Sequence, residues 1–257
     1  MKEHLICATC GTHYYERPAN DNCMICADER QYVPVTGQVW VRPQQLSDKH
    51  SVRVKELKPG MYEFEITPQF AIGQRAFFIT TPAGNVLWDC IPLLDEALVA
   101  FIRSKGGLQA IAISHPHYYS NMREWAETFG CQVYLHAADK AYVVDMHSHI
   151  QFWEEKELKM WEDVTLINAG GHFPGSTVLL NGNDLFCGDT MYLSQSMQHL
   201  SVMFSYPNRI PLPVTESLRV LQLLEQLPFE NLYGFLAYQN LIGNAKDIIT
   251  KSINKYV

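Results

Sequence analysis

The sequence predicts an α/β (α+β) fold in which helices cover a β-sheet, preceded by a small segment that binds metal. Three observations support this prediction. Short apolar runs alternate with amphipathic helical patterns beyond residue 50, and ligand-type side chains follow several of these runs. Four of the seven cysteines lie in two close pairs before residue 30. With 257 residues, of which 47% are hydrophobic, the chain can bury one large core.

The composition disfavours several classes of partner. The formal net charge of −7 argues against nonspecific binding to nucleic acid or to an acidic membrane surface, because both are polyanions. There is no run of about 18 apolar residues and no signal-peptide core, so we expect a cytoplasmic protein with a small-molecule substrate and no membrane partner. The cysteine usage fits a reducing compartment, in which thiols bind metal or pack.

Residues 1–45 form the predicted metal-binding segment and linker, and residues 46–257 form the main domain. The segment contains the pairs Cys7-x-x-Cys10 and Cys23-x-x-Cys26, a doubled spacing typical of zinc-ribbon or rubredoxin-like sites. Four thiolates close a tetrahedral shell around one Zn²⁺ and leave no position for a substrate. We therefore expect a structural zinc that supplies the folding free energy of the segment, with iron as the alternative.

The main domain begins with a predicted β-hairpin that leads into a β-α-β unit. The expected strands are residues 51–54, 61–66, 76–80, 86–89 and 108–113, with a hairpin turn at 82–85. Amphipathic patterns predict helices at residues 94–104 and 121–129, which end at Gly106-Gly107 and Gly130.

Further strands and helices follow, interrupted by one long connection. The expected strands are 133–135, 165–167, 177–180, 184–187 and a last one at 232–234; the expected helices are 137–144, one capped by Thr215, and a last one at 245–256. Residues 191–214 are longer than an ordinary connection, so we interpret them as a lid or a wall of the substrate site.

Histidine and aspartate residues follow the predicted strands at four points. His115 and His117 lie in the loop between a strand and a helix, where the ends of strands leave side chains pointing into a crevice. The other stretches with ligand-type residues are Asp89 after a Val-Leu-Trp strand, Gly171-His172-Phe173-Pro174-Gly175-Ser176, and Gly188-Asp189-Thr190.

In this order and spacing, the four stretches resemble those of the metallo-β-lactamase fold superfamily of metal-dependent hydrolases. The resemblance covers residues of about 50 to 257. It implies a four-layer αββα sandwich with the site at one edge of its two sheets. It also implies that three histidines bind the first metal and that one aspartate bridges to a second, and these residues match His115, His117, His172 and Asp189.

The chain departs from the family pattern at the second metal. The family has His-x-His-x-Asp-His, whereas Tyr119 and Ser120 stand here in the places of the aspartate and the last histidine. A further family histidine is missing from residues 233–238. We therefore predict one metal, zinc or iron, at the histidine site. Ser120 is expected to cap the following helix.

These residues predict a mononuclear hydrolase of a small ester, thioester or lactone, in which a metal-bound hydroxide attacks an activated carbonyl. Proton transfer is assigned to Asp189, and Tyr119 is expected to donate a hydrogen bond to the developing oxyanion, since a phenol is a better acid than base at neutral pH. Asp89 is expected to orient the histidine loop as a hydrogen-bond acceptor.

Two other functions remain open at this point. His115 and His172 with Asp189 could form the two-histidine, one-carboxylate face of an iron dioxygenase, as in the persulfide dioxygenases that share this fold. The chain could also be a noncatalytic binding protein whose cysteine segment docks a partner, with a degenerate enzyme as its other domain. True β-lactamase activity is less favoured, because nothing in the sequence suggests a periplasmic protein.

Overall fold

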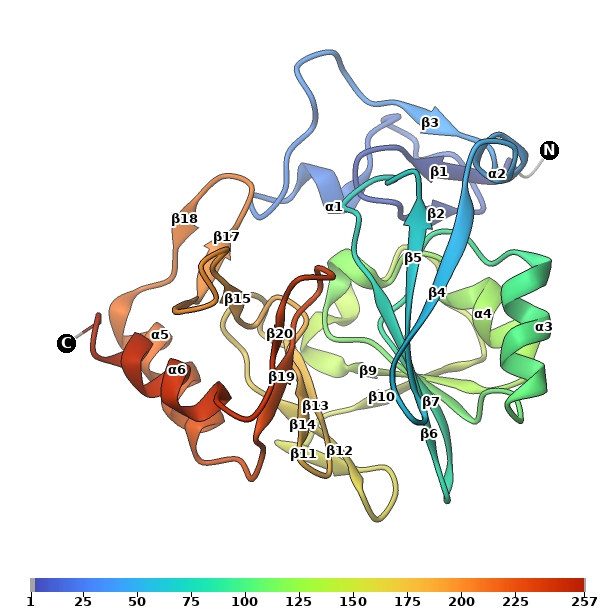
Figure 1. Ribbon diagram of the computed structural model, residues 1–257. Coiled ribbons are helices and arrows are strands. Elements are labelled where there is room, and N and C mark those ends of the chain that lie inside the picture. The colour runs from blue at the N-terminus through green and yellow to red at the C-terminus, as the bar shows by residue number, and fades with distance from the viewer. Residues whose placement is uncertain (1–2, 257) are drawn as a thin grey trace.

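The computed structural model describes residues 3–256 and contains two large β-sheets that face each other (Figure 1). The first sheet has seven strands in the order β10-β9-β8-β7-β6-β5-β4, and the second has six in the order β11-β12-β13-β14-β19-β20. Strands β4 to β7 form an antiparallel meander, whereas β7 to β10 are parallel neighbours. The predicted hairpin and β-α-β unit are therefore confirmed.

The strands of the first sheet are β4 (Ser51–Lys58), β5 (Met61–Thr67), β6 (Ala76–Thr81), β7 (Gly84–Trp88), β8 (Ala110–Ala112), β9 (Gln132–His136) and β10 (Ile150–Trp153). Those of the second are β11 (Glu157–Lys159), β12 (Val164–Asn168), β13 (Thr177–Asn181), β14 (Asp184–Phe186), β19 (Asn231–Tyr233) and β20 (Asn240–Leu241). The helices of the main domain are α3 (Glu96–Ser104), α4 (Met122–Phe129), α5 (Val214–Glu225) and α6 (Ala245–Ile253), with 3-10 turns η1 (Pro116–Tyr118) and η2 (Ala137–Tyr142).

Three apolar cores separate four layers. Side chains alternate across a strand, so Phe77 and Ile79 of β6 enter the core between the two sheets while Phe78 enters the core beneath α3 and α4. A third core lies between the second sheet and helices α5 and α6, and includes Leu221 and Ile249. This arrangement confirms the four-layer αββα sandwich.

The N-terminal segment forms its own small sheet and packs on the main domain (Figure 1). Its elements are β1 (Leu5–Cys7), β2 (His13–Tyr14), β3 (Trp40–Val41), α1 (Met24–Ala27) and α2 (Pro43–Ser47). The four cysteines form a buried cluster with Leu5 and Ile25, and partly buried side chains of the main domain, Ile72, Tyr142 and Val144, pack against this cluster. Helix α2 spans the boundary predicted between residues 45 and 46.

The structure corrects several expected boundaries. The connection 191–214 contains the short strands β15 (Tyr192–Leu193), β16 (Leu200–Ser201), β17 (Met203–Ser205) and β18 (Ile210–Pro211), which are too short to show an alternating pattern. Thr215 was expected to cap helix α5, but the N-cap is Pro213 and the helix begins at Val214. Strand β20 follows β19, which was expected to be the last strand.

Within residues 3–256, no helix has the length and apolar character needed to cross a membrane.

Ser120 does not cap helix α4. Asn121 stands at the N-cap, and Ser120 has a left-handed backbone conformation with φ of 41°. Its hydroxyl donates instead to the carbonyl of Gly11 at 3.2 Å, and its own carbonyl accepts from the backbone N–H of His13 at 3.2 Å. The contact with the N-terminal segment, more than 100 residues away in sequence, replaces the local capping bond.

We predict that Trp125→Ala lowers the free energy of unfolding by about 3 to 5 kcal/mol, because it empties a fully buried position in the core beneath α3 and α4. The Trp125 indole stacks near Phe64 and donates to the carbonyl of Ile91 at 3.3 Å. Urea-induced unfolding measures the change. The matched control Ile242→Ala, at a site that is 63% exposed, should change stability by at most about 0.5 kcal/mol. Equal effects of the two substitutions would contradict the core assignment.

Candidate functional site

The loop after β8 holds His115 and His117 in fixed orientations. The carboxylate of Asp89 accepts the backbone N–H of Ser114 at 2.7 Å, which confirms its expected role as an acceptor for this loop. The Nδ1 atom of His115 lies 2.8 Å from the Ser114 hydroxyl, so its Nε2 is the atom that faces the site. Turn η1 then brings His117 to the same side, and both imidazoles are buried.

His172 lies in the glycine-containing loop between β12 and β13. Its Nδ1 is 3.1 Å from the carbonyl of Met203, and because a carbonyl only accepts, Nδ1 carries the hydrogen and Nε2 is left as a ligand atom. The loop is closed by Ser176, whose hydroxyl accepts the backbone N–H of Phe173 at 2.8 Å.

Asp189 reaches the histidines because Gly188 lets β14 approach their loop. Gly188 has φ of +49°, and a Cβ at this position would lie 2.4 Å from the Ser114 hydroxyl oxygen. The Asp189 Oδ2 atom is 3.4 Å from His115 Nε2, 3.8 Å from His172 Nε2 and 3.9 Å from His117 Nδ1. The structure thus brings together the four residues expected at the histidine site.

The donor set fits a single metal ion. One ligand atom from each of His115, His117, His172 and Asp189 lies within 4.8 Å of the other three. Among the described residues, the buried His115 Nε2 has no hydrogen-bond partner, a costly arrangement that a cation would resolve. Burial lowers the pKa of His117 to about 4 and that of His172 well below its usual value. These two imidazoles are therefore neutral, as metal ligands must be.

Two tyrosines contact Asp189, and neither is Tyr119. The hydroxyl of Tyr118 donates to Asp189 Oδ1 at 2.5 Å, and that of Tyr206 donates to the Asp189 carbonyl at 3.0 Å. The Tyr119 ring is buried in the core beneath α3 and α4. Turn η1 decides which of the two adjacent phenols faces the site, and the sequence carries no signal for that direction. The catalytic role of Tyr119 stays a prediction.

Packing contacts occupy the positions that would hold a second metal in the family. Ser120 binds the N-terminal segment through Gly11. The loop after β19 is held by the buried guanidinium of Arg75, which donates to the carbonyls of Gly234 at 2.9 Å and Gln239 at 3.1 Å. Arg75 in turn pairs with buried Glu63 at 2.5 Å. Within residues 3–256, the histidine and cysteine clusters are the two groups whose geometry suits a metal.

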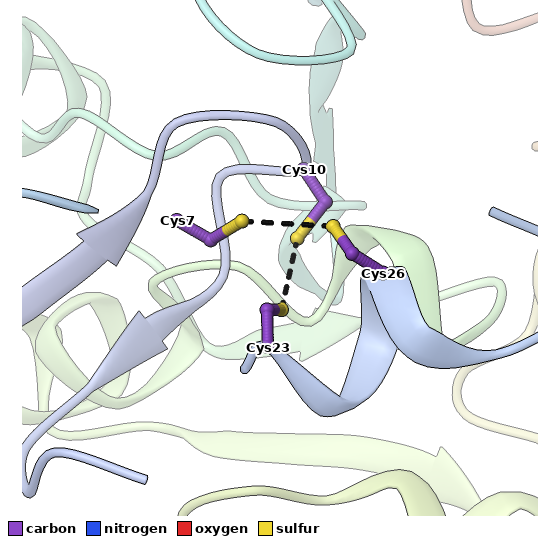
Figure 2. Close-up of side chains that lie close together, drawn as sticks. All are labelled: Cys7, Cys10, Cys23 and Cys26. Atoms are coloured by element: carbon purple, nitrogen blue, oxygen red, sulfur yellow. Dashed lines mark hydrogen bonds between the residues drawn. The ribbon is translucent and has the colours of Figure 1, made fainter. Parts of the chain in front are cut away.

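The four cysteines converge on one point (Figure 2). Cys7 Sγ lies 3.6 Å from Cys26 Sγ, Cys10 Sγ lies 3.5 Å from Cys23 Sγ, and all four side chains are buried. Burial and the neighbouring sulfurs raise the pKa of Cys10 well above its usual value. A cation held among the four sulfurs would favour their ionised form, and a closed tetrahedral shell of thiolates fits structural Zn²⁺.

A cavity of about 590 Å³ opens beside the histidine cluster and is lined by His117, His172 and Asp189. Three other parts of the chain line this cavity: the N-terminal segment, segment 191–214 and the loop after β19. The residues that they contribute are Gln31, Tyr192, Ser201, Met203, Tyr206, Pro207, Phe235 and Leu236. Apart from the two histidines, Asp189 is the one acidic or basic side chain of this lining among the described residues. A larger cavity of about 700 Å³ lies beyond the His172 loop, but none of the four ligand-type residues lines it.

Asp139 of η2 supports the His172 loop and was not expected from the sequence. Its buried carboxylate accepts the backbone N–H of Gly175 at 2.7 Å. A Cβ on residue 175 would lie 2.6 Å from the Asp139 carboxyl carbon, so glycine is required there. This contact joins residues that are 36 positions apart in the sequence, and no local sequence pattern predicts it.

Comparisons with known proteins give one relative in sequence and many in structure. No family model matches the chain. YmaE of Bacillus subtilis strain 168, described as an uncharacterized protein, is 37% identical over 265 residues, which cover 99% of this chain and 96% of YmaE.

The structural likeness is to metallo-β-lactamases. The crystal structure of DIM-1 metallo-β-lactamase has a TM-score of 0.61 at 13% identity, over 80% of this chain and 97% of that one. FIM-1 from Pseudomonas aeruginosa, in its mono-zinc form, has a TM-score of 0.59 at 10% identity, over 79% and 95%. The enzyme from Hirschia baltica has 0.57 at 15% identity, over 80% and 97%. These likenesses confirm the expected fold.

We predict that Asp139→Asn stabilises the protein more at high pH than at low pH. Burial raises the pKa of Asp139 to about 6, above the value of about 3.9 in an unfolded chain. Folding therefore favours the protonated form, and the associated stability is present below about pH 4 and lost as the pH rises through about 6. Urea unfolding should show the variant gaining about 1 to 2 kcal/mol on the wild type between about pH 4.5 and 8. A difference that does not change with pH would contradict this assignment.

Proposed function

Because the chain belongs to the same family as the Bacillus subtilis protein YmaE and has the fold of the metallo-β-lactamases, we propose that it is a metal-dependent hydrolase. Its substrate is a small ester, thioester or lactone. The observation that carries the proposal is the buried cluster of three imidazoles and one carboxylate beside a cavity large enough for a small molecule.

The proposal assigns one metal to each of two clusters. His115, His117, His172 and Asp189 would hold Zn²⁺ or Fe²⁺, and the four cysteines a structural Zn²⁺. When bound at the histidines, the ion supplies Lewis acidity for a carbonyl oxygen and lowers the pKa of water. Hydrogen bonds orient two of the imidazoles so that Nε2 faces the site: the Ser114 hydroxyl contacts Nδ1 of His115, and the Met203 carbonyl contacts Nδ1 of His172.

The two oxygens of the Asp189 carboxylate make different contacts. Its Oδ1 accepts the Tyr118 hydroxyl, which fixes the plane of the carboxylate, and its Oδ2 faces the three imidazoles. We assign proton transfer to Asp189: a carboxylate oxygen that does not ligate the ion would take a proton from the attacking water and return it to the leaving group. Tyr118 thereby acts as a positioning residue for Asp189.

The cavity favours an uncharged, largely apolar acyl group. Ile72, Met203 and Phe235 supply apolar lining, and Gln31, Gln69 and Ser201 supply neutral hydrogen-bonding groups. Among the described residues, no lysine or arginine lines it, so away from the proposed metal ion a carboxylate or phosphate on the substrate would be desolvated without a counter-charge. A neutral substrate incurs no such cost.

The hydrolase proposal is tested with purified protein reconstituted with Zn²⁺ or Fe²⁺ and assayed on matched neutral and anionic esters, thioesters and lactones. We expect neutral acyl substrates to have the higher kcat/KM. His115→Ala should lose one equivalent of metal and at least about 100-fold in kcat/KM, while the cysteine-bound metal remains. Unchanged hydrolysis in His115→Ala would contradict the proposal, and oxygen consumption by the iron form without hydrolysis would favour a dioxygenase.

We predict that Tyr118→Phe lowers kcat/KM by about 10-fold, because it frees the Asp189 carboxylate from its hydrogen bond. The adjacent Tyr119→Phe is the matched control and should change kcat/KM by less than about 2-fold. Initial rates at saturating metal measure both. If Tyr119→Phe has the larger effect, Tyr119 is the oxyanion donor that its position in the sequence predicted, and the role given to Tyr118 is wrong.

A further inference from the structure

Arg30 of the N-terminal segment contacts the backbone of His172. Its Nε donates to the His172 carbonyl at 2.6 Å. The guanidinium carbon lies 4.2 Å from the ring centre of Phe173 and 4.2 Å from that of Phe204, so the group is held between the two aromatic faces. Asp28 fixes the other side of the guanidinium with an ion pair at 3.0 Å. The side chain is thus oriented by four separate contacts.

The backbone around Arg30 is fixed to the segment that carries the other partner of His172. Ser205 donates its hydroxyl to the Arg30 carbonyl at 2.9 Å, and Asn208 donates its amide to the carbonyls of Glu29 and Gln31 at 3.0 and 2.8 Å. Ser205 belongs to β17, which also contains Met203, the residue whose carbonyl engages His172 Nδ1. Residues 29–31 therefore contact both the His172 backbone and the segment whose Met203 carbonyl orients the His172 imidazole.

The conformation of residues 28–31 depends on the cysteine cluster. They follow helix α1, which contains Cys26 and ends at Ala27. This helix has four residues, too few for a helix to be stable on its own. A metal bound by four cysteines from two turns would fix α1 and hence the position at which Arg30 leaves it.

We propose that Arg30 is a positioning residue through which the cysteine cluster supports the histidine metal site. The ligand geometry of His172, and with it the metal affinity of that site, depends on Arg30 and on the order of residues 23–31. The proposal rests on the metal-binding part of the proposed function and is independent of the substrate. It gives the N-terminal segment a role inside the hydrolase domain's own site.

The test uses the full chain with Co²⁺ in both sites. Cobalt bound by thiolates has sulfur-to-metal charge-transfer bands, whereas cobalt bound by imidazole and carboxylate shows weaker d–d bands, so each site is followed separately during titration with a competing chelator. In Arg30→Gln we expect the affinity of the histidine site to fall by about 10- to 100-fold while the thiolate bands are unchanged. Arg17→Gln, an exposed arginine of the same segment, is the matched control and should leave both affinities unchanged.

Two milder variants keep the test decisive if Arg30→Gln does not fold. Arg30→Lys keeps the charge and one donor and should recover part of the affinity, and Asp28→Asn, which removes the ion pair, should weaken the histidine site by a smaller factor. Wild-type affinity in the folded variants would overturn the proposal. If His115→Ala also left both cobalt signals intact, the proposed histidine metal site itself would have failed, which separates the two outcomes.

Discussion

A buried cluster of three imidazoles and a carboxylate is the constraint on which the rest of this structure depends. The buried Nε2 atom of His115 has no hydrogen-bond partner, which is costly in a protein interior, and a cation bound by the three imidazoles and the carboxylate would remove this cost. Each loop of the site has a specific restraint: Asp89 holds the loop of His115, Asp139 holds the loop of His172, and Tyr118 holds Asp189. These restraints follow strands β7, β8 and β9 of the first sheet, whereas His172 and Asp189 follow strands β12 and β14 of the second. The four-layer sandwich is therefore what lets the restraints and the ligand residues meet.

Packing contacts are found where the family resemblance implied ligands of a second metal. Where the family would place ligands, Ser120 joins the histidine loop to Gly11, and Arg75 holds the loop after β19. Both are contacts between distant segments, and the first connects the histidine loop to the cysteine segment. Arg30 makes the corresponding connection on the side of His172. The N-terminal segment therefore contacts both loops that carry histidines, which is the structural basis for the coupling that we propose between the two clusters.

Much of this arrangement could be predicted from the sequence, because the ligand-type residues stand in local motifs with glycine and proline. Metal binding is indicated by motifs only a few residues long: the cysteine pairs, the loop at 115–117 and the stretch at 171–176. Tyr118 could not be chosen over Tyr119, since the choice depends on the direction of side chains in a single 3-10 turn. Arg30 lies 142 residues from its partner and Asp139 lies 36, so their contacts exist only in the folded chain.

Anomalous X-ray diffraction from crystals of the purified protein, recorded on both sides of the zinc and iron absorption edges, would test the single-metal histidine site most directly. We predict two peaks per chain, one among the cysteine sulfurs and one between the three imidazoles and Asp189. The edge at which the second peak is seen identifies its metal. A further peak beside Tyr119 and Ser120, or protein that hydrolyses its substrate with no peak at the histidines, would contradict a mononuclear site formed by His115, His117, His172 and Asp189.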